Sequence, residues 1–132
     1  MNKQILTVAA LALMLTACGK PPPPKPDPTK PQVSVTATGT VGVDQETIEF
    51  APDQKDVTVT WQLPKGNYTF PQDGIVFERS AVEEIVRCQP AKGNVEFTCL
   101  NRHTKPGRYK YTIKVLDGQK ALEPYDPYFV NR

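Results

Sequence analysis

Three cysteines and one histidine carry most of the reactive chemistry that the sequence offers: Cys18, Cys88, Cys99 and His103. A thiol can form a disulfide, bind a soft metal ion, act as a nucleophile or be modified. A cupredoxin-like copper centre needs two histidines and a cysteine, whereas this chain has a single histidine and both of its methionines precede Cys18. The ligand set is therefore incomplete, and we expect neither a metal nor another cofactor. An odd cysteine count also leaves one thiol for something other than an intramolecular disulfide.

An export leader is predicted at the start of the chain. Lys3 gives the start a positive charge, and residues 5–17 are an uninterrupted run of apolar and small side chains. Because about 20 helical residues are needed to cross a bilayer, this run is too short for a transmembrane helix and fits the apolar region of a signal peptide. We therefore expect residues 1–17 to be a signal peptide.

The leader ends in Leu15-Thr16-Ala17-Cys18, which resembles the lipobox of bacterial lipoproteins. The resemblance implies that the Cys18 thiol receives a diacylglyceryl group, that the leader is cut just before it, and that the new amino terminus is acylated. Each buried methylene of such chains contributes about 0.8 kcal/mol, so several chains together anchor a protein stably. The alternative is an ordinary secretory leader that ends on a cysteine by chance.

Gly19 stands where some lipoproteins carry an aspartate. By resemblance to the lipoproteins of Gram-negative enteric bacteria, this implies transfer to the outer membrane, with the domain facing the periplasm. Retention in the inner membrane is the alternative. The membrane, reached through the lipid on Cys18, is thus the first expected partner.

Proline dominates the next segment, because residues 21–31 contain seven prolines and no apolar side chain that could join a core. Proline fixes φ near −65° and favours polyproline II, which rises about 3.1 Å per residue. We expect residues 18–31 to form a stiff spacer that holds the domain roughly 35–40 Å from the lipid. A docking ligand for a proline-recognising module is the alternative.

Short runs of alternating apolar and polar residues follow the spacer. In residues 57–63, Val59 and Trp61 share one face while the threonines share the other, as in a half-buried strand. Turn-forming residues separate such runs, and strands are expected at 32–41, 47–50, 57–63, 74–78, 81–88, 94–100, 108–115 and 128–130. We therefore expect one all-β domain over residues 32–132, a small sandwich of about seven or eight strands with an immunoglobulin-like or cupredoxin-like arrangement.

Residues 80–87 admit two interpretations. Ser80 and Glu83 have the spacing of a capping box, which would open a short helix. Val82, Ile85 and Val86 are β-branched and favour a strand. We expect the strand, because the hairpin that follows requires an extended chain up to the cysteine.

Cys88 and Cys99 enclose ten residues whose midpoint is Gly93-Asn94, a pair suited to a tight hairpin. With a two-residue loop, Cys88 faces Cys99 on adjacent strands at a separation that a disulfide spans, and Val86 shares their face. A redox-active pair is the alternative, although catalytic dithiols usually have CxxC spacing. We expect a structural disulfide, which leaves Cys18 as the odd thiol.

No residue pattern points to catalysis. Ser34 and Ser80 lie in no nucleophile motif, and the chain has no HExxH sequence or phosphate loop. His103 lies in a polar stretch and is expected to be a surface loop residue. Glu83 and Glu84 are adjacent, but a domain of about 100 residues has little room for a sugar-binding cleft beside its core. We therefore expect a protein that is not an enzyme.

Charge gives no sign of a nucleic-acid partner. The formal net charge is +2, and four of the lysines lie in the leader and the proline segment. The remainder is close to neutral, whereas phosphate binding needs clustered lysine and arginine. We expect no nucleic acid among the partners.

Aromatic residues near turns and near the end of the sequence are the expected binding surface: Tyr68, Tyr125 and Tyr128. A ring with a polar tip suits an interface, because one part is apolar and the other bonds to water or a partner. The alternative is that these rings fill the core of the sandwich.

The order of a tryptophan strand, YTFPQDGIVF, a cysteine hairpin, GRYKYTIKV and DPYFVN resembles a set of small proteobacterial envelope lipoproteins to which no activity is assigned. The resemblance implies an envelope location. We expect a protein-binding accessory or assembly lipoprotein with an envelope protein as partner. The alternatives are an inhibitor of a hydrolase such as lysozyme or a protease and, third, a small hydrolase.

Overall fold

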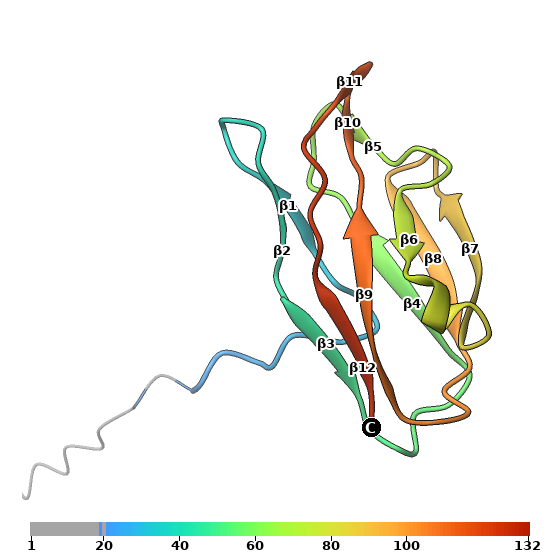
Figure 1. Cartoon of the computed structure of the whole chain (residues 1–132). Helices are drawn as coiled ribbons and strands as arrows, with labels where there is room; N and C mark the ends of the chain where they lie inside the picture. Colours follow the sequence, from blue (N-terminus) through green and yellow to red (C-terminus); the bar gives the residue numbers. More distant parts are fainter. Residues whose placement is uncertain (1–18, 20) are drawn as a thin grey trace, which may run out of the picture.

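Two β-sheets pack face to face (Figure 1). The structure, a computed structural model, describes Gly19 and residues 21–132, so Cys18 and the predicted leader lie outside the described residues. The first sheet has the order β4 (Val57–Gln62), β8 (Glu96–Asn101), β7 (Ile85–Ala91), and the second has the order β3 (Thr47–Phe50), β12 (Tyr128–Asn131), β9 (Gly107–Ile113), β6 (Ile75–Phe77). Only β3 and β12 pair in parallel within these sheets. The all-β prediction is confirmed, and the layers are consistent with a small sandwich.

Five further short strands form a hairpin and a small sheet. β1 (Val33–Val35) and β2 (Val41–Val43) form a hairpin, and β11 (Lys120–Ala121), β10 (Leu116–Asp117) and β5 (Tyr68–Thr69) form a small sheet. A 3-10 helix, η1 (Arg79–Ala81), lies between β6 and β7. The described residues thus contain twelve strands, more than predicted. One reason is that the strand expected at 32–41 is divided by a turn in which Gly39 has φ 83° and donates to the Thr36 carbonyl.

The predicted alternation produces the core. Trp61 and Phe97 of the first sheet are buried opposite Tyr111 and Phe129 of the second. The rings of Trp61, Phe77, Tyr111 and Phe129 form stacked and edge-to-face pairs with centroids 5.1 to 6.4 Å apart. Such pairs contribute about 0.5–1.5 kcal/mol each beyond the burial of their area. The aromatic residues therefore join the two sheets near the centre of the domain.

Two buried polar contacts also link the sheets. Asn101 on β8 and Asn131 on β12 exchange amide hydrogen bonds of 2.8 and 2.9 Å. Trp61 Nε1 donates to the Tyr111 hydroxyl at 3.2 Å, and burial raises the pKa of Tyr111. Because a buried polar atom without a partner costs free energy, these pairs favour one alignment of the two sheets.

The end of the predicted spacer belongs to the folded domain. The Asp27 carbonyl accepts a hydrogen bond of 2.9 Å from Gln45 Nε2, and Pro31 is buried. Contacts with the domain thus begin five residues before the expected start at Gln32. Residues 21–26 remain exposed. At about 3.1 Å per residue, the spacer is shortened by about 15 Å relative to the prediction.

This N-terminal segment covers the outer edge of β4. The carbonyls of Thr29 and Pro31 accept hydrogen bonds from the N–H groups of Thr60 and Gln62, at 2.8 and 3.1 Å. The segment runs parallel to β4 and continues into the β1–β2 hairpin, whose Val33 and Val41 are buried. The chain therefore closes one flank of its own sandwich.

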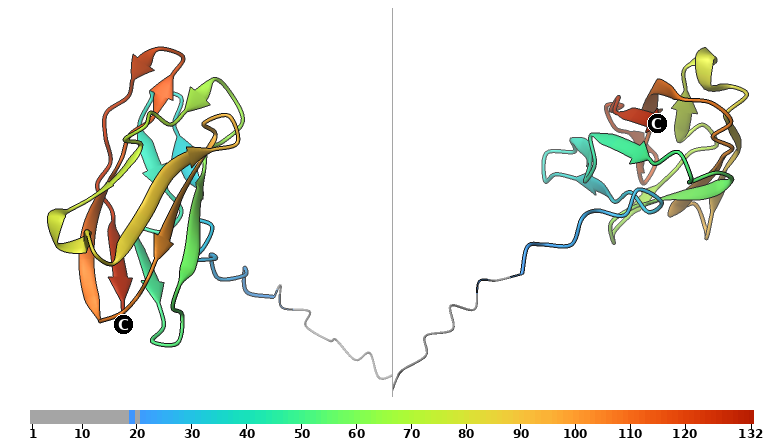
Figure 2. Two further views of the ribbon diagram at one scale, coloured as in Figure 1. Left: turned by 90° about the vertical axis from the view of Figure 1, so that its right-hand side faces the viewer. Right: turned by 90° about the horizontal axis from the view of Figure 1, so that it is seen from below.

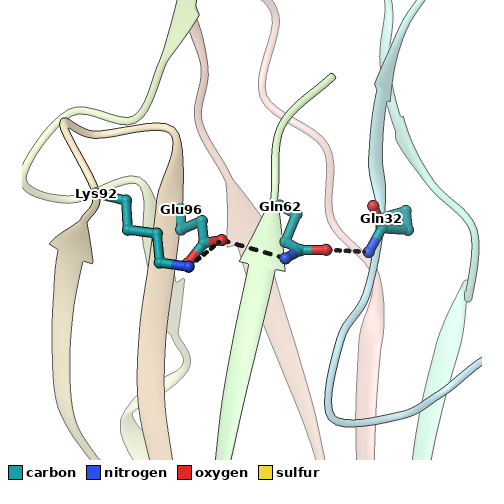
Figure 3. A network of polar contacts seen from close by, with 4 residues as sticks. All are labelled: Gln32, Gln62, Lys92 and Glu96. Carbon is teal, nitrogen blue, oxygen red and sulfur yellow. Dashed lines mark hydrogen bonds and ion pairs between the residues drawn. The ribbon is translucent and has the colours of Figure 1, made fainter. Parts of the chain in front are cut away.

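A polar network on the outer face secures the same segment (Figure 3). Gln32 Nε2 donates to Gln62 Oε1 at 2.6 Å, and Gln62 Nε2 donates to Glu96 Oε1 at 3.2 Å. Lys92 Nζ lies 3.5 Å from the same carboxylate oxygen. The network runs from the β7–β8 turn across β8 and β4 to the start of β1, so it connects four segments of the chain.

The β7–β8 hairpin has the predicted register next to its turn. Cys88 and Cys99 form a disulfide with their Cα atoms 4.1 Å apart, as expected. The last pair is Ala91 with Glu96, so the turn contains the four residues 92–95 rather than two. Three successive residues of this turn have positive φ, which accounts for its wider path.

A β-bulge at Arg87 changes the faces of β7 before the cysteine. The pairing shifts by one residue between Val86 and Gln89, and Arg87 has φ 54°. Val86 therefore pairs with Leu100, and the prediction that it shares the face of Cys88 is wrong. A bulge adds one unpaired residue, so side chains on its two sides exchange faces.

Neither interpretation of residues 80–87 holds for the whole segment. The 3-10 helix η1 ends at Ala81, a turn follows, and β7 begins at Ile85. Ala81 and Ile85 are buried, whereas Val82 between them is exposed. The expected strand is thus confirmed only for its second half.

Candidate functional site

Of the three tyrosines predicted as a binding surface, two lie near the start of β12 and one lies in the small sheet. Tyr68 is on β5 in the small sheet, Tyr125 precedes β12, and Tyr128 begins β12. Tyr68 and Tyr125 are half-buried and pack against the core. The Tyr125 hydroxyl donates to the Glu46 carboxylate, and the Arg108 guanidinium lies 4.2 Å from the centre of the Tyr128 ring. Each ring therefore interacts with its own domain.

The expectation that His103 is a surface residue is wrong, because its side chain is only 3% exposed. Its Nδ1 lies 2.8 Å from the Gln54 carbonyl oxygen, and its Nε2 lies 2.9 Å from the main-chain oxygen of Arg132. Main-chain oxygens only accept hydrogen bonds, so a ring nitrogen that carries a proton donates to its neighbouring oxygen. His103 thereby connects the β8–β9 loop to the β3–β4 loop and to the end of β12.

Glu84 holds the other side of the same loop. Its carboxylate accepts hydrogen bonds from the Thr104 hydroxyl and from the Thr104 N–H, the latter at 2.7 Å. Burial by itself would raise the pKa of Glu84, but these bonds, a further bond from the Lys105 N–H and the charge of Lys105 outweigh it and lower the pKa. The adjacent Glu83 is exposed. The two carboxylates noted in the sequence therefore have different roles, and Glu84 acts as a structural acceptor.

A pocket of about 170 Å³ lies beside this loop and is lined by His103, Thr104, Lys55, Lys105 and Arg132 among others. A hydrolase would need a nucleophile that is hydrogen-bonded to a base. Here the Thr104 hydroxyl donates to Glu84, and both ring nitrogens of His103 are bound to main-chain oxygens. The geometry makes the loop rigid and does not form a nucleophile and base pair.

The flank of the sandwich opposite the N-terminal segment holds a larger groove. Its volume is about 420 Å³, and it lies between β6 and β7, the outer strands of the two sheets. Figure 2 (left) looks onto this flank, with β7 in front and η1 at the side. Ile75, Phe77, Ile85 and Cys88 line the groove, together with Glu78 and Arg79. The groove is therefore mainly apolar, as binding sites usually are.

Exposed valines mark the same place. Val76 on β6 is 41% exposed and Val82 after η1 is 67% exposed, and both line the groove. Val95 in the β7–β8 turn is the other large apolar side chain that is exposed among the described residues, also at 41%. Two of the three exposed valines thus lie at this groove. We call the groove, together with Val76 and Val82, the open flank.

The outer strands of the two sheets are protected to different degrees. Proteins commonly protect an edge strand by covering it, by a charge, by a bulge or by proline. The N-terminal segment covers β4, β3 carries Glu49, and β7 carries the bulge at Arg87 and also Pro90. β6 reads Ile75-Val76-Phe77 and has none of these features. Its short length is the only protection that it shows.

The open flank was not among the sites predicted from the sequence. The run Ile75-Val76-Phe77 lies in a predicted strand, and one of three consecutive apolar residues in a strand must point outward. An outward valine is the signal that could have identified it. The signal is weak, since single exposed apolar residues are common on protein surfaces.

No protein-family model matches the chain, and no curated protein is significantly similar to it.

Among residues 19 and 21–132, no three or more histidine, cysteine, aspartate or glutamate side chains are grouped so that they could hold a metal ion. The same residues contain no helix that is both long and apolar enough to span a membrane.

Proposed function

We propose that this chain is a bacterial lipoprotein, held to the outer membrane by lipid on Cys18, whose periplasmic domain is a protein-binding accessory or assembly module. The observation that carries the binding role is the open flank. A groove of about 420 Å³ is lined by apolar residues of β6 and β7, and Val76 and Val82 are exposed beside it. Clustered apolar side chains on a surface are typical of interaction sites.

The contrast between the two flanks supports the same role. On one side, hydrogen bonds from Thr60 and Gln62 hold the N-terminal segment against β4. On the other side, no segment that the structure describes covers β6. Figure 1 shows the β1–β2 hairpin and the β6–β7 side at opposite flanks. A partner at the open flank would contribute the cover that the chain supplies for itself at the other flank.

The anchor is supported by the sequence alone, through the apolar run of residues 5–17 and the Leu15-Thr16-Ala17-Cys18 pattern. Residues 21–26 are exposed and lead into the domain at Asp27. A short proline-rich segment of this kind would keep the domain near the membrane surface, within reach of other anchored proteins.

A photo-reactive amino acid in place of Val82 tests the binding role. In cells that express the full chain, illumination should give a covalent adduct with a protein, because Val82 is 67% exposed at the groove. The same amino acid in place of Val95 is the control, since Val95 is exposed on the turn between β7 and β8. Adducts of equal yield at both positions, or none at Val82, would refute the binding role of the open flank.

Cys18→Ser tests the anchor. The variant should lose incorporation of a fatty-acid probe and keep its leader, because the serine hydroxyl does not replace the thiol that the lipobox resemblance requires. Cys88→Ser is the control and should be labelled like the unchanged chain. Normal labelling of the Cys18→Ser variant would overturn the lipoprotein assignment and leave the binding proposal standing.

A further inference from the structure

We infer that the partner of the open flank is a second copy of this chain, which pairs its β6 antiparallel with β6 of the first copy. The inference rests on the proposed function, because it requires the open flank to be a protein-binding surface.

The free main-chain groups of β6 are the first reason. The Lys114 N–H donates to the Gly74 carbonyl at 2.7 Å, and the Glu78 N–H donates to the Lys110 carbonyl at 3.0 Å. In an antiparallel pair, alternate residues direct both main-chain groups to the partner strand. The main-chain groups of Gly74, Val76 and Glu78 therefore point toward β9. The N–H and C=O groups of Ile75 and Phe77 point away from it.

These free groups suit an extended strand. Among the described residues, no hydrogen bond outside the sheet pairings involves the main chain of Ile75 or Phe77. An added strand would supply two donors and two acceptors at the spacing of β6. The unprotected apolar composition of β6, compared with β3, β4 and β7, makes it the outer strand best suited to such pairing.

β6 is complementary to itself in one register. If Val76 faces Val76 of the second copy, Ile75 and Phe77 of each copy exchange hydrogen bonds with Phe77 and Ile75 of the other. This gives four main-chain bonds with two-fold symmetry, and each of the free groups is satisfied. A shift by one residue would break the two-fold match between donors and acceptors.

Charges just beyond β6 agree with this register. Asp73 lies in the turn before the strand and Arg79 begins η1 after it, so antiparallel pairing brings Asp73 of one copy to the same end of the pair as Arg79 of the other. Asp73 already binds Lys114 Nζ at 2.7 Å, and the hydrogen bond from Lys114 lowers the pKa of the Asp73 carboxyl. Arg79 has no ion pair with another described residue in the chain. Opposite charges at both ends favour the antiparallel over the parallel direction.

A Val76→Cys variant of the full chain provides the test. In this register the two cysteines form a pair without main-chain hydrogen bonds between them, whose Cα atoms lie about 4.5 Å apart, within the range of a disulfide. After mild oxidation of cells that express the variant, a non-reducing gel should show the covalent dimer as the main form. Val95→Cys is the matched control, because Val95 and Val76 are equally exposed at 41%. It should remain monomeric like the unchanged chain.

A second variant measures the non-covalent dimer. The unchanged full chain in detergent should show a mass that rises from one to two copies with concentration, and Val76→Lys should abolish this rise because two lysines would face each other. Loss of folding is not expected, since residue 76 points to solvent. Equal cross-linking of Val76→Cys and Val95→Cys, or an unchanged mass profile for Val76→Lys, would overturn the inference.

The outcome separates this inference from the proposed function. If the photo-reactive group at residue 82 joins a different protein while Val76→Cys stays monomeric, the open flank binds another protein and self-pairing is refuted. If residue 82 forms no adduct and Val76→Cys stays monomeric, both fail. A dimeric adduct at residue 82 together with the Val76→Cys dimer supports both.

Discussion

Replacement of Cys88 and Cys99 by alanine should lower the free energy of unfolding by about 3 kcal/mol, since the disulfide closes a short loop and restricts the unfolded chain. The bond joins the outer strand β7 to the central strand β8 beside the bulge at Arg87, where the regular pairing is interrupted. A domain of this size has roughly 5–15 kcal/mol of total stability. The loss is therefore a large fraction of the whole.

Urea unfolding followed by the fluorescence of Trp61 measures this effect, because Trp61 is the one tryptophan and is fully buried. The unchanged chain under reducing conditions is the control, since it lacks the covalent link but keeps the buried Cys99 side chain. Its midpoint should lie close to that of the double variant. If oxidised and reduced chains unfold at the same urea concentration, the stabilising role of the disulfide is disproved.

Asn101→Ala should destabilise the domain by about 2–6 kcal/mol. Asn101 and Asn131 are buried and exchange two hydrogen bonds between β8 and β12. Removal of one amide leaves both the oxygen and the nitrogen of the other without a partner, and each such buried group costs about 1–3 kcal/mol. Asn131→Ala should have an effect of similar size for the same reason.

The double variant Asn101→Leu with Asn131→Leu distinguishes a true pair from two independent residues. It should cost clearly less than the sum of the two single changes, because no polar atom is left unpaired. Gln32→Ala is a control for a side-chain amide that forms an exposed hydrogen bond, and it should change stability by less than about 0.5 kcal/mol. Additive effects of the two asparagine changes in thermal or urea unfolding would argue against coupling.

Much of the fold follows from local patterns. The alternation around Val59 and Trp61 places both in the core, and the symmetry of the segment around Gly93-Asn94 brings Cys88 beside Cys99. Each of these patterns extends over about a dozen residues or fewer. The bulge at Arg87 was not predicted, because the pattern of apolar and polar residues does not show which strand residue adopts a left-handed conformation.

Long-range contacts explain the other differences. His103 is polar and sits among turn-forming residues, yet its two partners, Gln54 and Arg132, lie 49 and 29 residues away. Likewise, the sequence places Asp27 in the proline-rich spacer, whereas its hydrogen bond with Gln45 makes it part of the domain. A polar side chain looks exposed in sequence until its distant hydrogen-bond acceptors are known.

An all-β domain with an alternating core and one disulfide hairpin follows from the sequence alone, because side-chain period and turn symmetry act between near neighbours along the chain. The sequence also carries the Leu15-Thr16-Ala17-Cys18 pattern on which the proposed anchor depends. The tertiary structure was needed to establish that His103 is buried between Gln54 and Arg132, and that the chain itself closes one flank. It likewise decided that β6 is left with Val76 outward and its main-chain groups free. An edge is defined by which strands lie next to each other, and that depends on the whole fold.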